Sequence, residues 1–225
     1  MGRPHARHLL AHETALMAQV LKEAVRASIQ KAALRCFAGQ GYGGTSMADI
    51  AAAAQTAPAN LYRYYPSKEA LFDAVVPADL ARRHDLLLDT RVSALAEGNA
   101  HEAATAADLL DFWLEHRLAM IVLLDNAEGT RFAAYPAAFV ERLVRHAATA
   151  LDGKPFPGHE EILRLVFDNT RKAIASILAA GEDREHTSAL ITTFWSYQIP
   201  GLRGLIAFIN ADLARTTRHG RGILG

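Results

Sequence analysis

Residues 45–71, TSMADIAAAAQTAPANLYRYYPSKEAL, contain the pattern that decides the fold. A short amphipathic segment is followed by a break, a second short helix with two tyrosines, and a third helix that opens on Ser-Lys-Glu. Pro58 suits the first turn of a helix, and Ser67 is a good cap for the next one. This order of elements is the one that lays a short helix in the major groove of DNA and fastens its ends to phosphates.

The short helix predicted over 58–64 has an inward and an outward side. Leu61 and Tyr65 lie four residues apart and are expected to anchor it, because seven residues do not form a stable helix alone. Asn60 and Arg63 then point toward solvent or a ligand, and arginine can pair bidentately with guanine. A solvated surface position is the alternative for Arg63. Apolar spacing also predicts a preceding helix whose inner face carries Val25, Ile29, Ala32, Ala33, Cys36 and Phe37.

The rest of the chain is expected to be helical, since it lacks bounded stretches of strict apolar and polar alternation. The chain is therefore predicted to be all-α. The expected helices cover roughly 22–39, 46–54, 58–64, 68–88, 101–125, 136–151, 159–180 and 186–209. With 225 residues, 51% of them hydrophobic, the chain can form one or two domains.

Composition narrows the class of protein. No apolar run approaches the ~20 residues of a membrane span, and the single cysteine fits a reducing cytoplasm, so we expect a soluble cytoplasmic protein. The net charge of zero conceals an asymmetry: residues 1–71 hold 8 Lys and Arg against 4 acids, and the remainder holds 16 against 20. A basic N-terminal part suits a polyanionic partner. An unevenly charged globular surface is the plainer explanation.

An enzyme is not expected. The ten histidines are scattered, and no phosphate-binding loop, nucleophile elbow or histidine-glutamate metal signature is present. His8 and His12 share helical spacing, but no third ligand accompanies them. We therefore expect no cofactor, no metal and no catalytic residues.

Residues 45–71 resemble the DNA-binding domain of the TetR (tetracycline repressor) family of bacterial transcriptional regulators. The resemblance lies in Thr45-Ser46, Ile50-Ala51, Leu61-Tyr62-Arg63-Tyr64-Tyr65 and Ser67-Lys68-Glu69-Ala70-Leu71. It covers about residues 25–75. The turn departs from the family pattern, because Gln55 replaces a glycine and Ala57 replaces a serine. Gln55 must accept the turn geometry at a conformational cost, and the loss of the serine removes a helix cap.

The resemblance implies the function and the DNA contacts. It implies a helix-turn-helix domain over 22–75 after an extension at 1–21, with a helical effector-binding and dimerisation domain over 76–225. Thr45 and Ser46 would meet phosphate, Pro58, Ala59, Asn60 and Arg63 would face base edges, and Tyr62, Tyr64 and Lys68 would hold backbone phosphate. Packing on the first helix is the alternative for Tyr62. The expected partners are a palindromic double-stranded operator, a second copy of the chain and a small molecule.

The last two long helices are the expected homodimer interface, since half-sites related by two-fold symmetry require a dimer. The interface candidates are Ile162, Val166, Ile174, Ile177, Phe194, Trp195, Leu202 and Ile206. Both faces could instead be core within one chain. Candidates for an effector pocket are Phe112, Trp113, His116, Met120, Phe132, Tyr135 and Phe139. Their aromatic character favours an apolar or aromatic effector.

The sequence thus predicts a ligand-responsive DNA-binding regulator, a repressor released from its operator by a largely apolar effector. Activation instead of repression would use the same residues. A helical interaction protein that keeps the fold without specific DNA binding is the alternative from another class.

Overall fold

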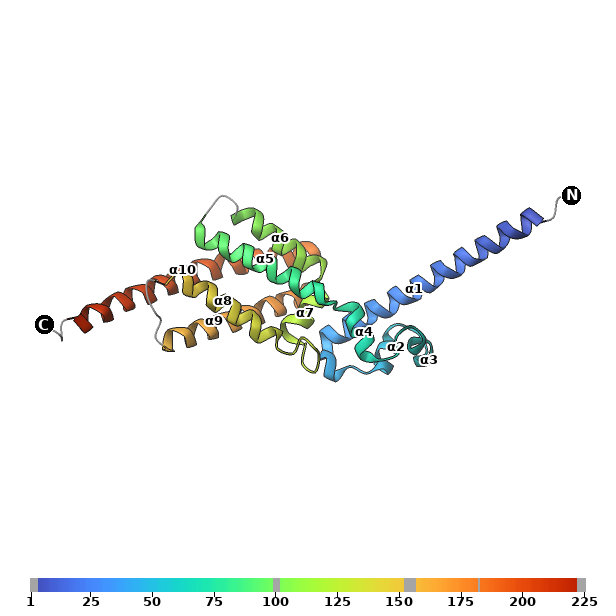
Figure 1. The fold of residues 1–225 in the computed structure, drawn as a ribbon, viewed down its shortest axis with the longest axis horizontal. Coiled ribbons are helices and arrows are strands. Elements are labelled where there is room, and N and C mark those ends of the chain that lie inside the picture. The colour runs from blue at the N-terminus through green and yellow to red at the C-terminus, as the bar shows by residue number, and fades with distance from the viewer. Residues whose placement is uncertain (1–3, 99–101, 152–156, 182, 222–225) are drawn as a thin grey trace. The chain divides into compact units, whose positions relative to one another are not determined.

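The computed structural model describes residues 4–98, 102–151, 157–181 and 183–221, and the only regular secondary structure there is helical (Figure 1). The predicted all-α class is confirmed. The chain divides into two compact units, Met1–Pro77 and Ala78–Gly225. No helix within the described ranges combines the length and apolarity that crossing a membrane requires.

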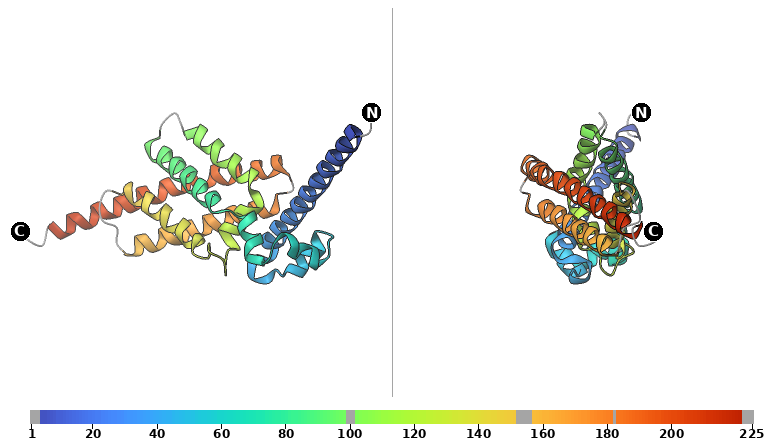
Figure 2. Two further views of the ribbon diagram at one scale, coloured as in Figure 1. Left: turned by 45° about the vertical axis from the view of Figure 1, so that its right-hand side comes forward. Right: turned by 90° about the vertical axis from the view of Figure 1, so that its left-hand side faces the viewer.

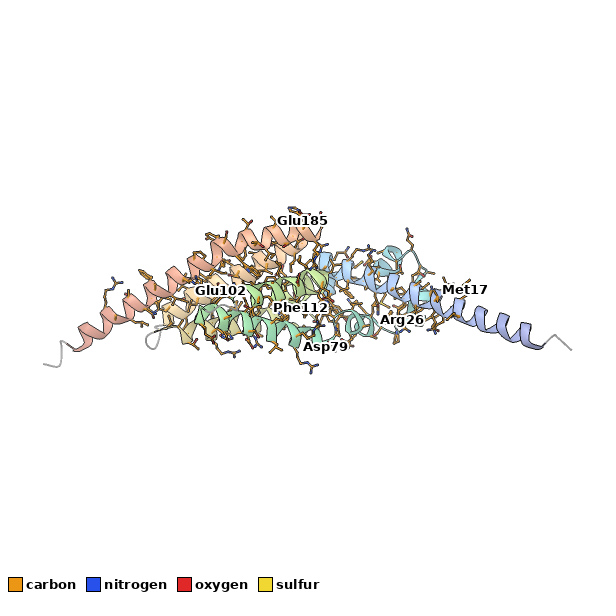
Figure 3. All side chains as sticks on the ribbon, turned by 90° about the horizontal axis from the view of Figure 1, so that it is seen from above. Met17, Arg26, Asp79, Glu102, Phe112 and Glu185 are labelled. Atoms are coloured by element: carbon orange, nitrogen blue, oxygen red, sulfur yellow. The ribbon has the colours of Figure 1, made fainter. Side chains whose placement is uncertain are left out.

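The first unit consists of α1 (Pro4–Gly44), α2 (Met47–Ala53), α3 (Pro58–Tyr64) and α4 (Lys68–Val75). α1 begins well before the predicted residue 22 and continues to a kink at Gly41, whose φ of 73° suits glycine. The first turns of α1 extend beyond the rest of this unit, and Met17 projects from them with 75% of its surface exposed (Figure 3). The predicted separation of an extension at 1–21 remains a prediction.

The core of the first unit forms where α1 packs against α2 and α4. Ile29, Ala33 and Phe37 of α1 are fully buried, as the apolar spacing predicts. The Phe37 ring lies 5.5 Å from that of Phe72 on α4, in an edge-on arrangement that favours aromatic pairs. Cys36 is buried beside them, and burial raises the pKa of its thiol.

The second unit consists of α5 (Ala78–Glu97), α6 (Glu102–Glu115), α7 (Arg117–Asp125), α8 (Tyr135–Thr149), α9 (Pro157–Ala180) and α10 (Arg184–Arg221). α9 packs against α7, α8 and α10, and α5 packs against α6 and α8 (Figure 2). α6 also contacts α10. The six helices therefore enclose a core with sides formed by α5, α6, α8, α9 and α10.

Two predicted helices are each broken in the structure. The prediction of one helix over 68–88 is wrong: it ends at Val75, because Pro77 has no N–H and forces Val76 out of helical geometry, to φ −127° and ψ 73°. The prediction of one helix over 101–125 is also wrong, with residue 101 outside the described ranges. The break is at His116, where ψ is 26°.

Gly181, at the end of α9, lies close against Thr187 near the start of α10. A Cβ at Gly181 would lie 1.9 Å from the hydroxyl oxygen of Thr187, so only glycine fits there. Arg117, at the start of α7, donates to the carbonyls of Leu178 and Gly181 at 2.7 Å each. This arginine therefore pairs carbonyls that α9 leaves free at its end.

A buried polar network joins α5 to α8. The Tyr135 hydroxyl donates to Asp85 Oδ1 at 2.8 Å and lies 2.6 Å from Nδ1 of the fully buried His84. Arg142 donates to both Asp85 and Asp89. The His84 ring stacks between two phenylalanine rings, and burial lowers its pKa to about 3, with the charge of Arg142 acting in the same direction. His84 is therefore a neutral core residue.

Candidate nucleic-acid interface and cavity

The start of α2 is closed by a reciprocal cap. The amide of Asp49 donates to the Ser46 hydroxyl at 3.1 Å, and the amide of Ser46 donates to the Asp49 carboxylate at 2.8 Å. This capping box satisfies two amides that the helix itself cannot pair. Ser46 is exposed, whereas Thr45 is buried and its hydroxyl donates to the Gly41 carbonyl at 2.8 Å. Of the two predicted phosphate contacts, only Ser46 presents its side chain to solvent.

Lys68 fastens the beginning of α4 to the turn between α1 and α2. Its ammonium group donates to the carbonyls of Tyr42 and Thr45, at 2.8 and 2.9 Å, and lies 4.2 Å from the centre of the Tyr42 ring. Two of the three ammonium protons are therefore engaged within the protein. The sequence did not predict these contacts, because they join residues more than twenty positions apart.

α3 is held by two anchors, as its spacing predicts. Leu61 is fully buried and Tyr65 is 7% exposed. The Tyr65 hydroxyl accepts a hydrogen bond from Gln30 of α1 at 2.8 Å. Asn60 is half-buried and donates to the Thr56 hydroxyl at 2.9 Å. The Leu61 and Tyr65 contacts fix one side of a helix that is too short to be stable alone, and the Asn60 bond ties its first turn to the preceding turn.

The other side of α3 is open to solvent. Pro58, Ala59, Tyr62 and Arg63 are exposed, and Tyr64 is half-buried. Arg63 forms no ion pair with any acid in the described part of the chain, although its guanidinium offers five donors. A cation beside two tyrosines on an anchored helix is well suited to contact the edges of bases and the phosphates next to them.

The turn before α3 has the strain and the missing cap that the sequence predicts. Gln55 adopts a φ of 54°, in the left-handed region where glycine is favoured. Ala57 is the N-cap residue of α3 and offers no side-chain hydrogen bond, while Pro58 occupies the first turn. The fixed φ of proline preorganises that first turn and offsets part of the loss.

Comparison with known proteins identifies the first unit. Residues 29–75 match the sequence model of a family described as bacterial regulatory proteins, tetR family. Residues 29–75 form a tetR-family domain. The resemblance inferred from the sequence is thereby confirmed, and the matched segment contains the whole of α2, α3 and α4.

Two solved structures are similar over most of the chain. A tetR-family transcriptional regulator from Streptomyces coelicolor is 20% identical, with 84% of this chain and 90% of that chain covered and a TM-score of 0.39. NalD, the secondary repressor of the MexAB-OprM multidrug efflux pump in Pseudomonas aeruginosa, is 18% identical, with 78% and 95% covered and a TM-score of 0.36. No curated protein matches the chain. The similarity to the tetR family therefore rests on residues 29–75.

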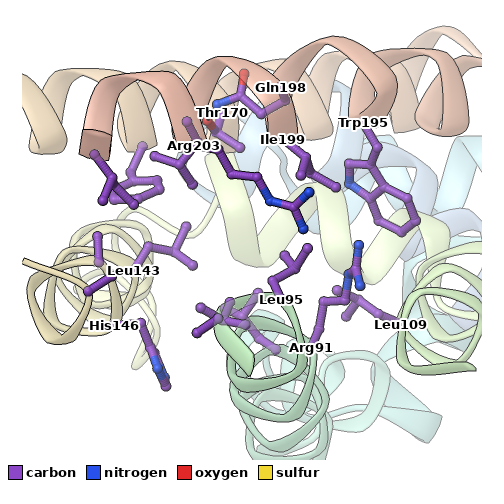
Figure 4. Close-up of a pocket in the computed structure, with 18 of the residues that line it drawn as sticks. Arg91, Leu95, Leu109, Leu143, His146, Thr170, Trp195, Gln198, Ile199 and Arg203 are labelled. Carbon is purple, nitrogen blue, oxygen red and sulfur yellow. Dashed lines mark hydrogen bonds between the residues drawn. The ribbon is translucent and has the colours of Figure 1, made fainter. Parts of the chain in front are cut away.

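The second unit, which follows the tetR-family domain, contains a cavity of about 420 Å³ between α5, α6, α8, α9 and α10 (Figure 4). Its wall is mostly apolar, and its polar lining includes Arg91, Thr170, Gln198 and Arg203. This size and this mixture of groups are typical of small-molecule sites.

The cavity includes two of the predicted effector-pocket residues, Trp113 and Phe139. The other five lie elsewhere: Met120 is fully buried core, Tyr135 belongs to the His84 network, and Phe112 stacks on His84 with His116 beside it. Phe132 packs edge-on against Tyr135 at 6.5 Å.

The arginines that line the cavity were not predicted from the sequence. A signal existed for Arg91, which shares a helical face with Leu88 and Leu95, so an arginine was already aligned with inward positions.

The predicted interface residues of α9 and α10 divide between two sides of these helices. Ile174, Trp195, Leu202 and Ile206 line the cavity, and Ile174 is only 2% exposed. Val166, Ile177 and Phe194 are half-buried, and Ile162 is 40% exposed. Other large apolar side chains are exposed on the same two helices: Leu165, Tyr197 and Phe208.

Among the described residues, no group of three histidine, cysteine or acidic side chains is placed to hold a metal ion. The relatives with printed titles are transcription regulators.

Proposed function

We propose that the protein is a homodimeric, ligand-responsive transcriptional regulator that inserts α3 into the DNA major groove. The observation that carries the proposal is the anchoring of α3 within a tetR-family domain. Leu61 and Tyr65 are buried and hold the helix, while Tyr62 and Arg63 are left exposed. A rigid helix with free donors on one side is what direct recognition of base edges requires.

The proposed DNA contacts divide between base edges and backbone phosphates. Pro58, Ala59, Asn60 and Arg63 would face base edges, and Tyr62, Tyr64 and Ser46 would contact backbone phosphates. Thr45 and Lys68 would act on phosphate less directly, because both are engaged in holding the turn between α1 and α2. Their side chains would set the position of the α2 cap relative to α4.

The dimer would form through the exposed sides of α9 and α10. Ile162, Leu165, Tyr197 and Phe208 offer apolar surface that the chain itself leaves uncovered. A second copy that brings the same patch would bury these side chains against each other around a two-fold axis. Each half-site of a palindromic operator would then receive one α3 helix.

The regulator would act as a repressor whose ligand occupies the cavity of the second unit. A ligand shifts the protein toward release only if it binds the DNA-free conformation more tightly than the DNA-bound one. A cavity with walls from five helices suits this role, since filling it changes the packing of α5, α6, α8, α9 and α10 together.

The test is selection of bound fragments from genomic DNA, followed by titration of the best fragment with wild type and Arg63→Ala. We expect loss of about tenfold or more in affinity for Arg63→Ala, since a bidentate arginine–guanine pair discriminates by about 1–3 kcal/mol. Arg145→Ala removes the same charge from an exposed position on α8 and should leave affinity unchanged. Binding of the wild type should also fall steeply with salt.

An interaction protein without specific DNA binding is the second candidate, because the turn before α3 is strained at Gln55 and uncapped at Ala57. Selection that returns no preferred fragment, or equal affinity for all fragments, would favour this candidate and reject the regulator.

A further inference from the structure

Two arginines approach each other inside the cavity of the second unit. Arg91 extends from α5 and Arg203 from α10, and both side chains reach into the space between these helices (Figure 4). Arg91 is 6% exposed as a residue, whereas 59% of the Arg203 side chain is exposed. The cavity therefore has one buried cation and one cation at the surface.

The carboxylate of Glu102 interacts with both arginines. Glu102 accepts from Arg203 at 3.5 Å, and its other oxygen lies 3.9 Å from Arg91, too far for a hydrogen bond. Arg91 donates a hydrogen bond to the Glu102 backbone carbonyl at 2.8 Å. Two positive charges thus share one negative charge, and this end of the cavity is electropositive.

The buried cation is incompletely compensated. Burial lowers the pKa of the Arg91 guanidinium, and Arg203 acts in the same direction, whereas Glu102 opposes it. A buried charge is costly unless it is paired and hydrogen-bonded. An additional anion between the two arginines would supply the missing partner.

The rest of the cavity is apolar and aromatic. The Trp195 ring lies 5.7 Å from the Arg91 guanidinium carbon and 5.7 Å from the Trp113 ring. Leu95, Leu109 and Ile199 continue the apolar wall. The indole N–H of Trp113 is buried without a hydrogen-bond partner, and buried donors in native structures usually have one. An acceptor atom of a ligand would satisfy it.

From these contacts we infer that the cavity binds an amphipathic carboxylate. Its acid group lies between Arg91 and Arg203, and its aliphatic or aromatic body packs along Trp113 and Trp195. This inference rests on the proposed ligand response for its biological meaning, and the binding itself can be measured without DNA. It changes the effector expected from the sequence, an apolar molecule, to an apolar molecule with one acidic end.

Tryptophan fluorescence gives a direct test, because the chain's only two tryptophans both line the cavity. The probes are decanoate and 4-phenylbutyrate, each compared with the alcohol of the same carbon skeleton, decan-1-ol and 4-phenylbutan-1-ol. At least one acid should bind wild type about tenfold more tightly than its alcohol, the factor expected for charge-assisted hydrogen bonds. Binding of the alcohol as tight as that of the acid in both pairs, or no binding of any probe, overturns the inference.

The variants locate the acid group. Arg203→Gln should abolish the preference for acid over alcohol while leaving alcohol affinity unchanged, and this exposed position should tolerate the change. Arg91→Gln should do the same if it folds, as checked by circular dichroism; if it does not, Arg203→Gln alone decides. Glu102→Gln should increase the preference, since it removes the competing carboxylate. Arg215→Gln, an exposed arginine later on α10 and outside the cavity lining, is the matched control.

The outcomes separate this inference from the proposed function. Retained acid preference in Arg203→Gln overturns the inference, whatever the protein does with DNA. Acid binding that depends on Arg203 but does not release a selected DNA fragment supports the site and rejects the ligand response. Acid binding in a protein that selects no DNA supports the site and rejects the regulator.

Discussion

The two units place their polar side chains in opposite ways. In the first unit the polar groups of α3 lie outside, and no charged side chain among its described residues is buried. In the second unit His84, Arg91, Thr105, Arg171 and Thr187 are buried. The first unit thus has a largely apolar core and presents its polar groups on the surface, whereas the second unit buries several polar groups in its core. A change of pH should therefore alter the stability of the second unit, and removal of a buried apolar side chain should lower the stability of the first.

The largest expected effect is the loss of stability of the second unit in acid. The pKa of His84 falls to about 3 in the folded protein from an ordinary 6.5, so the unfolded chain binds the extra proton between these values. The stability contributed by neutral His84 is complete above about pH 6.5 and decreases by about 1.4 kcal/mol for each pH unit from there to about pH 3, by roughly 5 kcal/mol in all. Urea unfolding followed by tryptophan fluorescence, at about pH 7 and about pH 5, measures the difference.

His84→Gln is the control for this titration, because glutamine has no charge to gain. The groups around His84, namely Tyr135, Asp85 and Arg142, stay in place and keep their own titrations. The pH slope of wild type minus that of the variant isolates His84. Equal slopes would mean that the histidine is not a neutral core residue.

The next effect concerns the anchor of the first unit. Leu61→Ala removes a fully buried side chain from beneath α3 and should lower the free energy of unfolding by about 2–5 kcal/mol. Leu86→Ala, at a position 68% exposed on α5, should cost less than about 0.5 kcal/mol. Urea unfolding followed by circular dichroism compares them. Similar costs at both positions would show that α3 is not held by Leu61.

A smaller effect distinguishes two roles of Lys68. Lys68→Gln removes the charged donor to the carbonyls of Tyr42 and Thr45 and should destabilise the first unit by about 1–3 kcal/mol. Lys172→Gln, which alters an exposed pair with Asp168, should change stability by less than about 1 kcal/mol. Unchanged stability in Lys68→Gln together with weaker DNA binding would assign the lysine to phosphate instead of the turn.

The smallest expected effect is an increase in the stability of the first unit. Ala57→Ser restores a side-chain acceptor at the N-cap of α3 and should stabilise the first unit by about 1 kcal/mol. Ala59→Ser, two residues into the same helix, adds the same hydroxyl without a capping position. Thermal unfolding that shows equal shifts for the two variants would exclude capping as the cause.

The features that the sequence could predict are those that depend on residues close together along the chain. Ser67 as a cap, Leu61 and Tyr65 as anchors, and the strained Gln55 were predictable, since each depends on neighbours within about one helical turn. Spacing along one helix contains that information. The boundaries near Val75 and His116 were missed because a proline and a single non-helical residue interrupt otherwise continuous periodic patterns.

The cavity could not be predicted in the same way. Arg91 and Arg203 are about 110 residues apart in sequence, and Glu102 between them is the acid that both approach. Tyr135 has the aromatic character of a pocket residue, yet its hydroxyl is engaged with Asp85 and His84. Which side of α10 faces inward depends on packing against α6 and α9, and no local pattern contains that information.

The rate at which Cys36 is labelled by a thiol reagent can report how often the first unit opens. Cys36 is the only cysteine of the chain, it is buried, and burial raises the pKa of its thiol, so a thiol reagent should react with it faster when the surrounding helices separate. Both tryptophans belong to the second unit. Labelling rates and fluorescence therefore follow the two units separately in one unmodified molecule, and a comparison of the two signals would measure how cooperatively they unfold.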